Sequence, residues 1–494
     1  MTVAIMLQGT GSDVGKSVLV AGLCRAFVNR GMTVKPFKPQ NMSNNAAVTK
    51  TGGEIGRAQA LQAIACKTAP TVHMNPVLLK PQSDTGAQII VQGKVAGTGD
   101  SSYYRKNKDE LLKKVIESFE CLKKDADIII VEGAGSPAEV NLREHDIANM
   151  GFAVATQTPV ILIGDIDRGG VIASIVGTHE LLSYGDNQLV KGYIINKFRG
   201  DMSLFDNALK IITARTGWQN IGILPFVPAV KKLPAEDAVV LDHVKNSDTN
   251  NIVIAVPMLS RIANFDDFDP LISEPDIEVR FIPPGDIIPT QADLIIIPGT
   301  KATLTDLAFF KLHGWDIDLA SHIRRGGKVL GICGGYQMLG KVIADPFGIE
   351  GKCVEEIGLG YLDVNTIMKT DKTVTKTNAY SDLYKCEATG YEIHIGNTTG
   401  PDTSQPFFSQ ENIELGCLSK DHKIAGVYLH GLFNDDIFRM KYLSEFRDGT
   451  LNKTAFNEQI ENALDILAKE MEKHLDLEKI IEIAGEMPLK PTSD

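Results

Sequence analysis

The chain has 494 residues, too many for a single hydrophobic core, so its length favours two or more domains. Hydrophobic residues make up 43% and charged residues 23%, as in soluble globular proteins. No apolar run approaches the roughly 18 residues that a membrane span requires. The formal net charge of −12 disfavours nonspecific binding to nucleic acid or to anionic membranes, so an acidic substrate would need a local basic pocket.

The cysteines predict neither a zinc site nor a disulfide framework, because they are scattered and form no C-x-x-C pair. They are Cys24, Cys66, Cys121, Cys333, Cys353, Cys386 and Cys417. The segment MTVAIMLQGTGSDVGKS lacks the basic region of a secretion signal and is typical of a first strand. Both observations favour a cytoplasmic location.

Strand and helix patterns alternate through the first half of the chain. Short β-branched runs, each followed by a glycine or polar break, occur at Val3–Leu7, Ile128–Val131, Val160–Ile163, Tyr193–Ile195 and Ile221–Leu224. Apolar residues at helical spacing from Val20 to Phe27, with a stop at Gly31, predict a helix after the first strand. This alternation predicts a mostly parallel sheet, in an α/β domain over residues 1–228.

A second α/β domain is expected after a linker. The stretch 229–250 is polar and interrupted by proline, as linkers are. A new strand series then occupies Ile252–Val256, Leu294–Ile297, Val329–Ile332 and Gly426–Leu429, which predicts a domain over residues 251–450. Residues 451–494 carry Glu, Lys, Leu and Ile at helical spacing and predict C-terminal helices.

The segment GTGSDVGKS, from Gly9 to Ser17, follows the first predicted strand. Backbone N–H groups of such a loop, with the N-terminus of the next helix, cradle phosphates. Lys16 is expected to reach the β and γ phosphates, and Ser17 to bind magnesium. The nucleotide-binding residues predicted in the loop are Gly11, Asp13, Gly15, Lys16 and Ser17. The leading glycine lies one residue further out than in the common spacing, and a purely structural glycine turn is the alternative.

The longer spacing resembles the phosphate loop of dethiobiotin synthetase and its relatives. That resemblance implies ATP and Mg²⁺ as cofactors, with Glu132 of VEGAGS as a magnesium-binding carboxylate. It also implies that Asn196 of INKFRGD contacts the adenine. A solvated loop carboxylate and a turn former are the alternatives for these two residues.

The segment GGKVLGICGGYQMLG puts Cys333 directly after a predicted strand, between Gly331 and Gly335. Glycines at these positions permit the sharp strand-to-helix turn that exposes a nucleophile, as in G-x-S-x-G. Backbone N–H groups after the thiol can stabilise an oxyanion, and a second donor is expected near Gly299 and Thr300. A buried inert cysteine is the common alternative, but it does not explain why glycines lie on both sides of Cys333.

His430, in GVYLHGLF, is expected at the end of a neighbouring strand. A cysteine and a histidine on adjacent strand ends suit thiol activation and protonation of leaving ammonia. The second half therefore resembles a class I glutamine amidotransferase domain. Most members have a glutamate two residues after the histidine, where this chain has Leu432. Cobyric acid synthases and cobyrinic acid diamide synthases, which this domain resembles, work with a Cys–His pair, and that resemblance implies a Cys–His dyad here. His394, in GYEIHIG, either lines this site, lies at the contact between the domains, or is a hydrogen-bonded structural histidine.

Nearly the whole chain resembles the cobyric acid synthase family. The segments that carry the resemblance are KPFKPQNMSNNA, GGEIGRAQALQA, HMNPVLLKP, VEGAGSPAEVNL, GDIDRGGV, GICGGYQMLG, GYEIHIG and YLHGLF. Cobyrinic acid a,c-diamide synthases share both domains but typically lack QNMSNN and HMNPVLLKP. The resemblance implies a ligase that amidates four carboxylates (b, d, e and g) of cobyrinic acid a,c-diamide, usually adenosylated on its cobalt. By the same resemblance, L-glutamine would supply the ammonia at Cys333, and ATP would activate each carboxylate as an acyl phosphate.

The cobalt would belong to the substrate, since no cluster of metal ligands is evident in the sequence. Arg57, Lys80, Lys38 and Arg168 are candidates for binding the polyanionic corrin, although each is better explained as a plain surface or structural charge. Two other functions remain open. One is a P-loop switch protein with an inactive glutaminase-like domain, against which the intact Cys333 and His430 argue. The other is an amidotransferase that acts on a cell-wall precursor.

Overall fold

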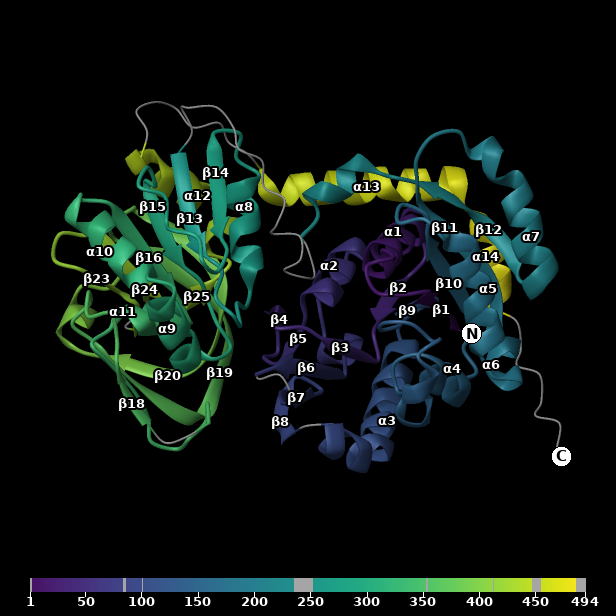
Figure 1. Cartoon of the computed structure of the whole chain (residues 1–494), viewed down its shortest axis with the longest axis horizontal. Helices are drawn as coiled ribbons and strands as arrows, with labels where there is room; N and C mark the ends of the chain where they lie inside the picture. The colour runs from purple at the N-terminus through teal and green to yellow at the C-terminus, as the bar shows by residue number, and fades with distance from the viewer. Residues whose placement is uncertain are drawn as a thin grey trace.

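The computed structural model describes residues 2–82, 86–99, 101–234, 252–351, 354–411, 413–446 and 455–485. The chain forms two lobes that lie side by side (Figure 1). Residues 2–234 form the N-terminal lobe and residues 252–446 form the C-terminal lobe. One long helix, α13 (Phe456–His474), lies along the N-terminal lobe.

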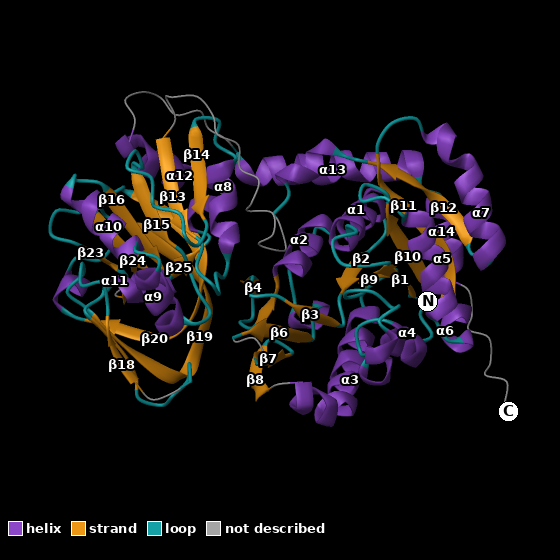
Figure 2. Cartoon of the chain, viewed as in Figure 1, coloured by secondary structure: helices purple, strands orange, loops and turns teal. Residues whose placement is uncertain are grey.

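The N-terminal lobe is built on a parallel sheet in the order β12-β11-β10-β1-β9-β2. Its strands are β1 (Val3–Gly9), β2 (Val34–Phe37), β9 (Ile128–Glu132), β10 (Val160–Asp165), β11 (Val190–Phe198) and β12 (Gln219–Pro225). The central strands are apolar and buried along most of their length, because helices cover both faces of the sheet (Figure 2). The parallel α/β sheet predicted from the sequence is confirmed.

Helices follow the strands in the order expected for βαβ units. They are α1 (Lys16–Asn29), α2 (Arg57–Ala65), α3 (Ser101–Lys123), α4 (Met150–Thr156), α5 (Val171–Leu181), α6 (Tyr184–Leu189) and α7 (Asp206–Thr216). Four short 3-10 helices accompany them: η1 (Val72–Met74), η2 (Val140–His145), η3 (Met202–Phe205) and η4 (Pro228–Lys232). The predicted first helix is α1, and it ends just before Gly31, whose φ is +86°.

Short strands after β2 form two small sheets that the sequence pattern did not indicate. One has the order β3-β6-β7-β8, and the other pairs β4 with β5. Their bounds are β3 (Gln40–Met42), β4 (Ala46–Val48), β5 (Glu54–Gly56), β6 (Val77–Pro81), β7 (Ala87–Val91) and β8 (Lys94–Gly99). Apolar side chains of this region pack against Tyr391 and Ile393 of the C-terminal lobe, so the small sheets form part of the contact between lobes.

The C-terminal lobe has a second mostly parallel sheet, in the order β14-β13-β15-β16-β24-β23, with β23 antiparallel. Its strands are β13 (Ile252–Pro257), β14 (Ile277–Ile282), β15 (Leu294–Ile297), β16 (Lys328–Ile332), β23 (Cys417–Leu418) and β24 (Ile424–Val427). Its helices are α8 (Asp269–Ile272), α9 (Thr303–Leu312), α10 (Trp315–Arg324), α11 (Gly334–Leu339) and α12 (Asp436–Leu443). The short 3-10 helices are η6 (Phe265–Phe268), η7 (Pro401–Ser404), η8 (Leu432–Asn434) and η9 (Ser444–Phe446). The second α/β domain is also confirmed.

A further sheet, largely antiparallel, packs beside this one. It comprises β17 (Val342–Asp345), β18 (Val354–Ile357), β19 (Asn365–Ser381), β20 (Cys386–Thr399), β21 (Phe408–Gln410), β22 (Ile413–Leu415) and β25 (Leu429–His430). The predicted strand Gly426–Leu429 is therefore divided. Residues up to Val427 belong to the main sheet, whereas Leu429 and His430 pair with β20 in the other sheet. His430 consequently lies at the junction of the two sheets.

The predicted linker, 229–250, lies mostly outside the described residues, which omit 235–251. Its first residues belong to the N-terminal lobe, because Ala229 and Val230 of η4 and the adjacent Leu233 pack against the lobe's core. The predicted C-terminal helices are described over α13 and α14 (Leu477–Gly485), and residues 486–494 lie outside the described part.

Both C-terminal helices return to the N-terminal lobe, a position that the sequence did not predict. Their apolar faces join the core that contains β1 and α1. The start of α13 contacts the C-terminal lobe, since the Phe456 N–H donates a hydrogen bond to Asp436 Oδ1 at 3.2 Å. Gly22 allows α13 to approach α1 closely, because a Cβ there would lie 2.5 Å from Met471 Cε. This helix therefore bridges the two lobes.

A buried arginine of α1 anchors α13. The side chain of Arg25 is 1% exposed, and its guanidinium pairs with Glu461 at 2.6 Å and with Asp465 at 3.0 Å. The same guanidinium donates hydrogen bonds to the carbonyl oxygens of Ile64 and Ala65, at the end of α2. One side chain of α1 thus satisfies polar groups of two other helices, α2 and α13.

We predict that Arg25→Met lowers the free energy of unfolding by about 2 kcal/mol, because two buried carbonyls lose their donors and two carboxylates lose their cation. Arg30→Met is the matched control. Arg30 also pairs with α13 and α14, through Glu472 and Glu478, but in a half-exposed position where a pair is worth about 0–1 kcal/mol. Hydrogen exchange of the α1 and α13 amides measures both changes. Equal effects of the two substitutions would contradict the anchoring role of Arg25.

Candidate active sites

The predicted phosphate loop joins β1 to α1. Two of its residues have left-handed backbone, Asp13 (φ +57°) and Gly15 (φ +95°). A Cβ at Gly15 would lie 2.5 Å from Asn196 Nδ2, so this position requires glycine for space as well as for conformation. The ammonium group of Lys16 donates to the carbonyl oxygens of Gly11 at 2.9 Å and Gly135 at 3.0 Å. The Lys16 ammonium therefore lies between the loop and the segment after β9.

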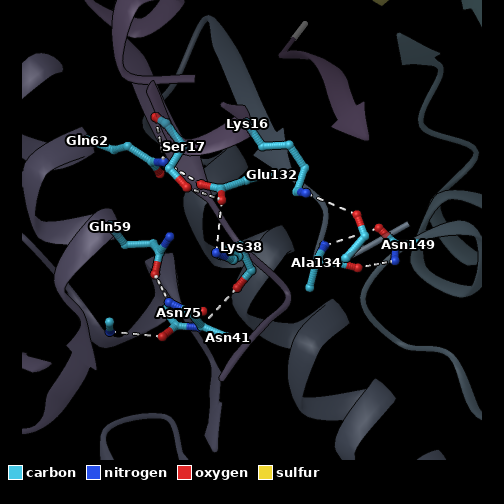
Figure 3. A network of polar contacts seen from close by, with 12 residues as sticks. Lys16, Ser17, Lys38, Asn41, Gln59, Gln62, Asn75, Glu132, Ala134 and Asn149 are labelled. Carbon is cyan, nitrogen blue, oxygen red and sulfur yellow. Dashed lines mark hydrogen bonds and ion pairs between the residues drawn. The ribbon is translucent and has the colours of Figure 1, made fainter. Parts of the chain in front are cut away.

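Glu132, at the end of β9, is the centre of a buried polar network beside this loop (Figure 3). Ser17 Oγ donates to Glu132 Oε1 at 2.7 Å, and Lys38 Nζ lies 2.8 Å from the same oxygen. Gln62, from α2, donates to the other carboxylate oxygen and to the Ser17 carbonyl. The sequence predicted Ser17 and Glu132 as a pair, and the structure brings them into contact. Gln62 was not predicted.

Asn196 lies near the end of β11, at the same edge of the sheet. Its Nδ2 donates to the Val14 carbonyl at 2.8 Å, so in this structure the side chain supports the phosphate loop. The neighbouring Lys197 has left-handed backbone (φ +60°), and its ammonium binds the Asp13 carbonyl at 2.6 Å and Asp165 Oδ2 at 2.7 Å. The loop is thus held by two consecutive residues of β11.

The four basic residues suggested for corrin binding all have acidic partners. Lys38 pairs with Glu132, Lys80 with Glu54, Arg57 with Asp266 and Arg168 with Asp13. The first three pairs are largely buried, and only the Arg168 pair is exposed. Ion pairs within the protein therefore account for the positions of these four basic side chains.

Cys333 occupies a strained turn between β16 and α11. Its backbone has φ +51° and ψ −107°, a conformation that few non-glycine residues adopt. The glycines around it are required by packing, because a Cβ at Gly335 would lie 2.1 Å from the Ile297 carbonyl oxygen, and one at Gly331 would lie 2.7 Å from Gly335 backbone. This is the nucleophile-elbow geometry that the sequence predicted.

His430 has a partner that the sequence did not reveal. Its Nδ1 lies 2.7 Å from Asp267 Oδ2, and the Gly431 N–H donates to Asp267 Oδ1 at 2.6 Å. Both side chains of the His430–Asp267 pair are at most 2% exposed. The predicted Cys–His dyad is thus a Cys–His–Asp arrangement in the structure. Leu432, at the position of the usual glutamate, instead packs in the apolar core of the lobe.

The surroundings of His430 favour its protonated form. Burial disfavours the charged imidazole, but the charge and hydrogen bond of Asp267 and the contact with Cys333 outweigh burial and raise the pKa of His430 to about 10. Tyr391 stacks on the imidazole, with ring centroids 5.4 Å apart. At neutral pH the site therefore holds an imidazolium next to the thiol, an arrangement suited to a thiolate nucleophile.

A cavity opens beside Cys333 and His430, and residues of both lobes line it. Lys80 comes from the N-terminal lobe, and the C-terminal lobe contributes the remaining side chains, which include Lys301, Lys372, Glu350 and Gln337. Lys80 and Lys372 both pair with the buried Glu54. Burial alone would raise the pKa of Glu54, but these two ammonium groups lower it to about 2. The N-terminal lobe thus completes the wall of the thiol site.

The remaining predicted residues also border this cavity. Gly299 and Thr300 line it, and a Cβ at Gly299 would lie 2.9 Å from His430 Cε1. A Cβ at Gly334 would lie 3.2 Å from the Thr300 nitrogen, so this N–H lies close to the turn after Cys333. His394 lines the cavity too, but its ring stacks on Tyr428, 3.8 Å between centroids, and its nitrogens contact Glu392 and the Gly396 carbonyl. The structure therefore favours a supporting role for His394.

The predicted residues form two separate sites, one in each lobe. The phosphate-loop residues, Glu132 and Asn196 lie at the carboxyl edge of the first sheet, and Cys333 and His430 lie in the C-terminal lobe. No helix in the described part of the chain has the length and apolarity to cross a membrane. Within the same residues, no group of three or more His, Cys, Asp and Glu side chains is arranged to hold a metal ion.

Comparisons with known proteins identify both lobes. Residues 5–240 match the CobQ/CobB/MinD/ParA nucleotide binding domain, and residues 253–438 match the CobB/CobQ-like glutamine amidotransferase domain. Cobyric acid synthase of Brucella anthropi is 55% identical over 485 residues, which cover 98% of this chain and 100% of the relative. Cobyric acid synthase of Rhizobium johnstonii is 56% identical over 476 residues, covering 96% and 97%. A solved MinD cell division protein from Aquifex aeolicus aligns with 47% of this chain and 85% of its own, at 15% identity and a TM-score of 0.28.

A nucleotide-binding P-loop domain joined to a glutamine amidotransferase domain defines a glutamine-dependent amidating ligase. Similarity to the synthases above extends over both domains and nearly every residue. The chain belongs to the cobyric acid synthase family, as the sequence motifs indicated.

Asp267→Asn is predicted to reduce the kcat of glutamine hydrolysis by about 1,000-fold or more, because the amide cannot stabilise the imidazolium or hold its tautomer. The charge of Asp267 raises the pKa of His430, so its removal lowers that pKa and moves the alkaline limb of the pH profile to lower pH. Rates of glutamine hydrolysis from pH 6 to about 10 measure both effects.

Asp269→Asn is the matched control for that substitution. Burial and the neighbouring carboxylates raise the pKa of Asp269 well above its ordinary value, so a neutral amide changes little there. A wild-type pH profile for Asp267→Asn would exclude Asp267 from the site chemistry.

Proposed function

We propose that this chain catalyses the ATP- and glutamine-dependent amidation of the b, d, e and g carboxylates of adenosylated cobyrinic acid a,c-diamide. The observation that carries the proposal is the presence, in one chain of the cobyric acid synthase family, of a phosphate loop with the Ser17–Glu132 pair and a buried Cys333–His430–Asp267 site. We also propose a cytoplasmic location, on the scattered cysteines of the sequence.

Ammonia is released at the thiol site. The Cys333 thiolate attacks the side-chain amide carbon of glutamine, and the C–N bond breaks as the His430 imidazolium gives its proton to the leaving nitrogen. The products of this step are ammonia and a γ-glutamyl thioester. Neutral His430 then takes a proton from the water that hydrolyses the thioester, which yields glutamate and restores the ion pair. N–H groups near Gly334 and Thr300 stabilise the oxyanion in both steps.

The corrin carboxylate is activated at the phosphate loop. The carboxylate attacks the γ-phosphorus of ATP and forms an acyl phosphate and ADP, and ammonia then displaces phosphate to give the amide. Lys16 and the loop N–H groups neutralise the charge of the transferring phosphoryl group. Asn196 remains the predicted adenine contact, in addition to its hydrogen bond with the loop.

Ser17 and Glu132 would hold Mg²⁺, which supplies charge neutralisation on the nucleotide phosphates. Their oxygens lie 2.7 Å apart at the end of β9 and provide the hard ligands that this ion prefers. Two protein ligands suffice, since Mg²⁺ in nucleotide sites usually keeps water and phosphate oxygens as its other ligands. Lys38, on the same carboxylate, balances its charge.

Two substitutions and two nitrogen sources test the division of labour. Cys333→Ala should abolish glutamine-dependent synthesis but keep activity with high ammonium, because the phosphate loop is unchanged. Lys16→Ala should abolish synthesis with either source, because the phosphoryl charge loses its cation. Mass spectrometry of the corrin amides, starting from the a,c-diamide, measures both. If folded Cys333→Ala lost its ammonium-dependent activity, or Lys16→Ala kept it, the assignment of the two sites would be wrong.

Lys301 is proposed to bind the α-carboxylate of glutamine. Its side chain lines the thiol cavity, and among the described residues it has no ion-pair partner, whereas Lys80 and Lys372 share Glu54. Burial and these two neighbouring ammonium groups lower the pKa of Lys301 to about 7. An incoming carboxylate would supply the negative charge that stabilises the Lys301 ammonium.

Lys301→Ala should raise the KM for glutamine by about 10- to 100-fold with little change in kcat, because one hydrogen bond to a charged group is lost. In the wild type, KM should rise as the pH passes about 7 and Lys301 loses its proton. Lys301→Arg should abolish this rise, because arginine keeps its charge. The amide 4-aminobutanamide, which lacks the carboxylate, should not distinguish Lys301→Ala from wild type. Lys420→Ala, at an exposed lysine, is the control. An equal loss with both amides would refute carboxylate binding.

A further inference from the structure

The turn that carries Asp267 is held by the other lobe. Residues 264–268 run from Asn264, which has left-handed backbone (φ +54°), through η6. Every residue of this turn is buried. Because Asp267 fixes the orientation of His430, any shift of the turn changes the geometry of the thiol site.

Three contacts from the N-terminal lobe hold this turn. The Ala46 N–H donates to Asn264 Oδ1 at 3.0 Å, and the Phe265 N–H donates to Asn45 Oδ1 at 3.4 Å. Arg57, the first residue of α2, forms an ion pair with Asp266 at 3.0 Å. The Arg57 N–H also donates to the Asn45 carbonyl at 3.2 Å, so the three contacts form one connected unit.

The turn holds several buried carboxyl groups, and Arg57 supplies the positive charge that they need. Asp266, Asp267 and Asp269 are close neighbours in the same apolar surroundings, and burial raises the pKa of Asp266 and of Asp269. The guanidinium of Arg57 opposes this effect on both carboxyl groups. Arg57 therefore holds the turn in place and also compensates the negative charge of its buried carboxylates.

The same helix reaches the phosphate site. Gln62 lies five residues after Arg57, which corresponds to a rise of about 7.5 Å along a helix. Its Nε2 donates to Glu132 and to the Ser17 carbonyl. Helix α2 therefore contacts the proposed magnesium-binding pair, Ser17 and Glu132, through Gln62. Through Arg57 it contacts the turn that carries Asp267. It is a rigid connection between two chemical sites in different lobes.

We propose that α2 couples the two active sites, with Arg57 as a positioning residue for Asp267 and hence for His430. Binding of nucleotide and corrin at the Ser17–Glu132 end shifts α2, and Arg57 transmits the shift to the Asp266–Asp267 turn. Glutamine is then hydrolysed fastest when an acceptor is ready. This inference rests on the proposed function, because it requires both reactions.

The experiment measures glutamine hydrolysis by the full chain, with and without ATP, Mg²⁺ and cobyrinic acid a,c-diamide. In the wild type, these ligands should raise kcat for hydrolysis several-fold. Arg57→Met should lower the basal kcat about 10-fold or more with little change in KM, and the ligands should no longer stimulate it. Arg57→Lys, which keeps the charge, should restore part of the stimulation. Ammonium-dependent synthesis by Arg57→Met should stay within about twofold of wild type, which also shows that the variant folds.

Arg280→Met is the control, since Arg280 pairs with Glu278 of the same strand, within the C-terminal lobe. Wild-type kcat and stimulation in Arg57→Met would overturn the inference, as would a purely KM effect or an equal loss of ammonium-dependent synthesis. If the kcat of wild-type glutamine hydrolysis did not change when ATP and the acceptor were added, the inference would also be wrong. Failure of the wild type to amidate the diamide would instead refute the proposed function.

Discussion

Carboxylates buried away from water need compensating positive charge, and this requirement organises the contact between the two lobes. Glu54 of the N-terminal lobe binds one lysine from each lobe, and Asp266 of the C-terminal lobe binds Arg57 of the other. If the lobes separated, each of these groups would face water or an unpaired neighbour. The charge pattern therefore favours one closed arrangement, in which the thiol cavity has a wall from each lobe.

The buried charges of the molecule are of two kinds. Some pair with a charge of the other lobe, and others line the thiol cavity. Arg57 and Lys372 each pair with a carboxylate of the other lobe and so hold the two lobes together. His430 and Lys301 have pKa values displaced toward or beyond the neutral range, to about 10 and about 7, and both line the cavity. Displaced pKa values at the lining of a cavity are characteristic of groups that act on a substrate.

The sequence was sufficient where local pattern determines structure. The phosphate loop, the turn at Cys333 and most strands of the two main sheets depend on short-range glycine spacing and β-branched runs, and the structure contains them. Strands β14 and β23 of the second sheet were not predicted. The same approach missed Asp267, because its partner His430 is 163 residues away and no local motif marks it. The run ANFDDFDP, acidic residues set among phenylalanines, was the available signal, since buried carboxylates in apolar surroundings need a reason. It also missed the small sheets of Gln40–Gly99, whose strands are mostly three to six residues long and whose pairing depends on the tertiary fold.

The return of α13 and α14 to the N-terminal lobe has a consequence for how the protein is made. The core around β1 and α1 includes Ile460, Leu467, Ile480 and Ile483, so it lacks one wall until those residues have left the ribosome. At about 5–20 residues per second, roughly 450 residues separate α1 from this wall by some 20–90 s. During that interval the apolar face of α1 is exposed, including the gap at Gly22 that Met471 later fills. The N-terminal lobe therefore completes this core only after α13 and α14 have been synthesised.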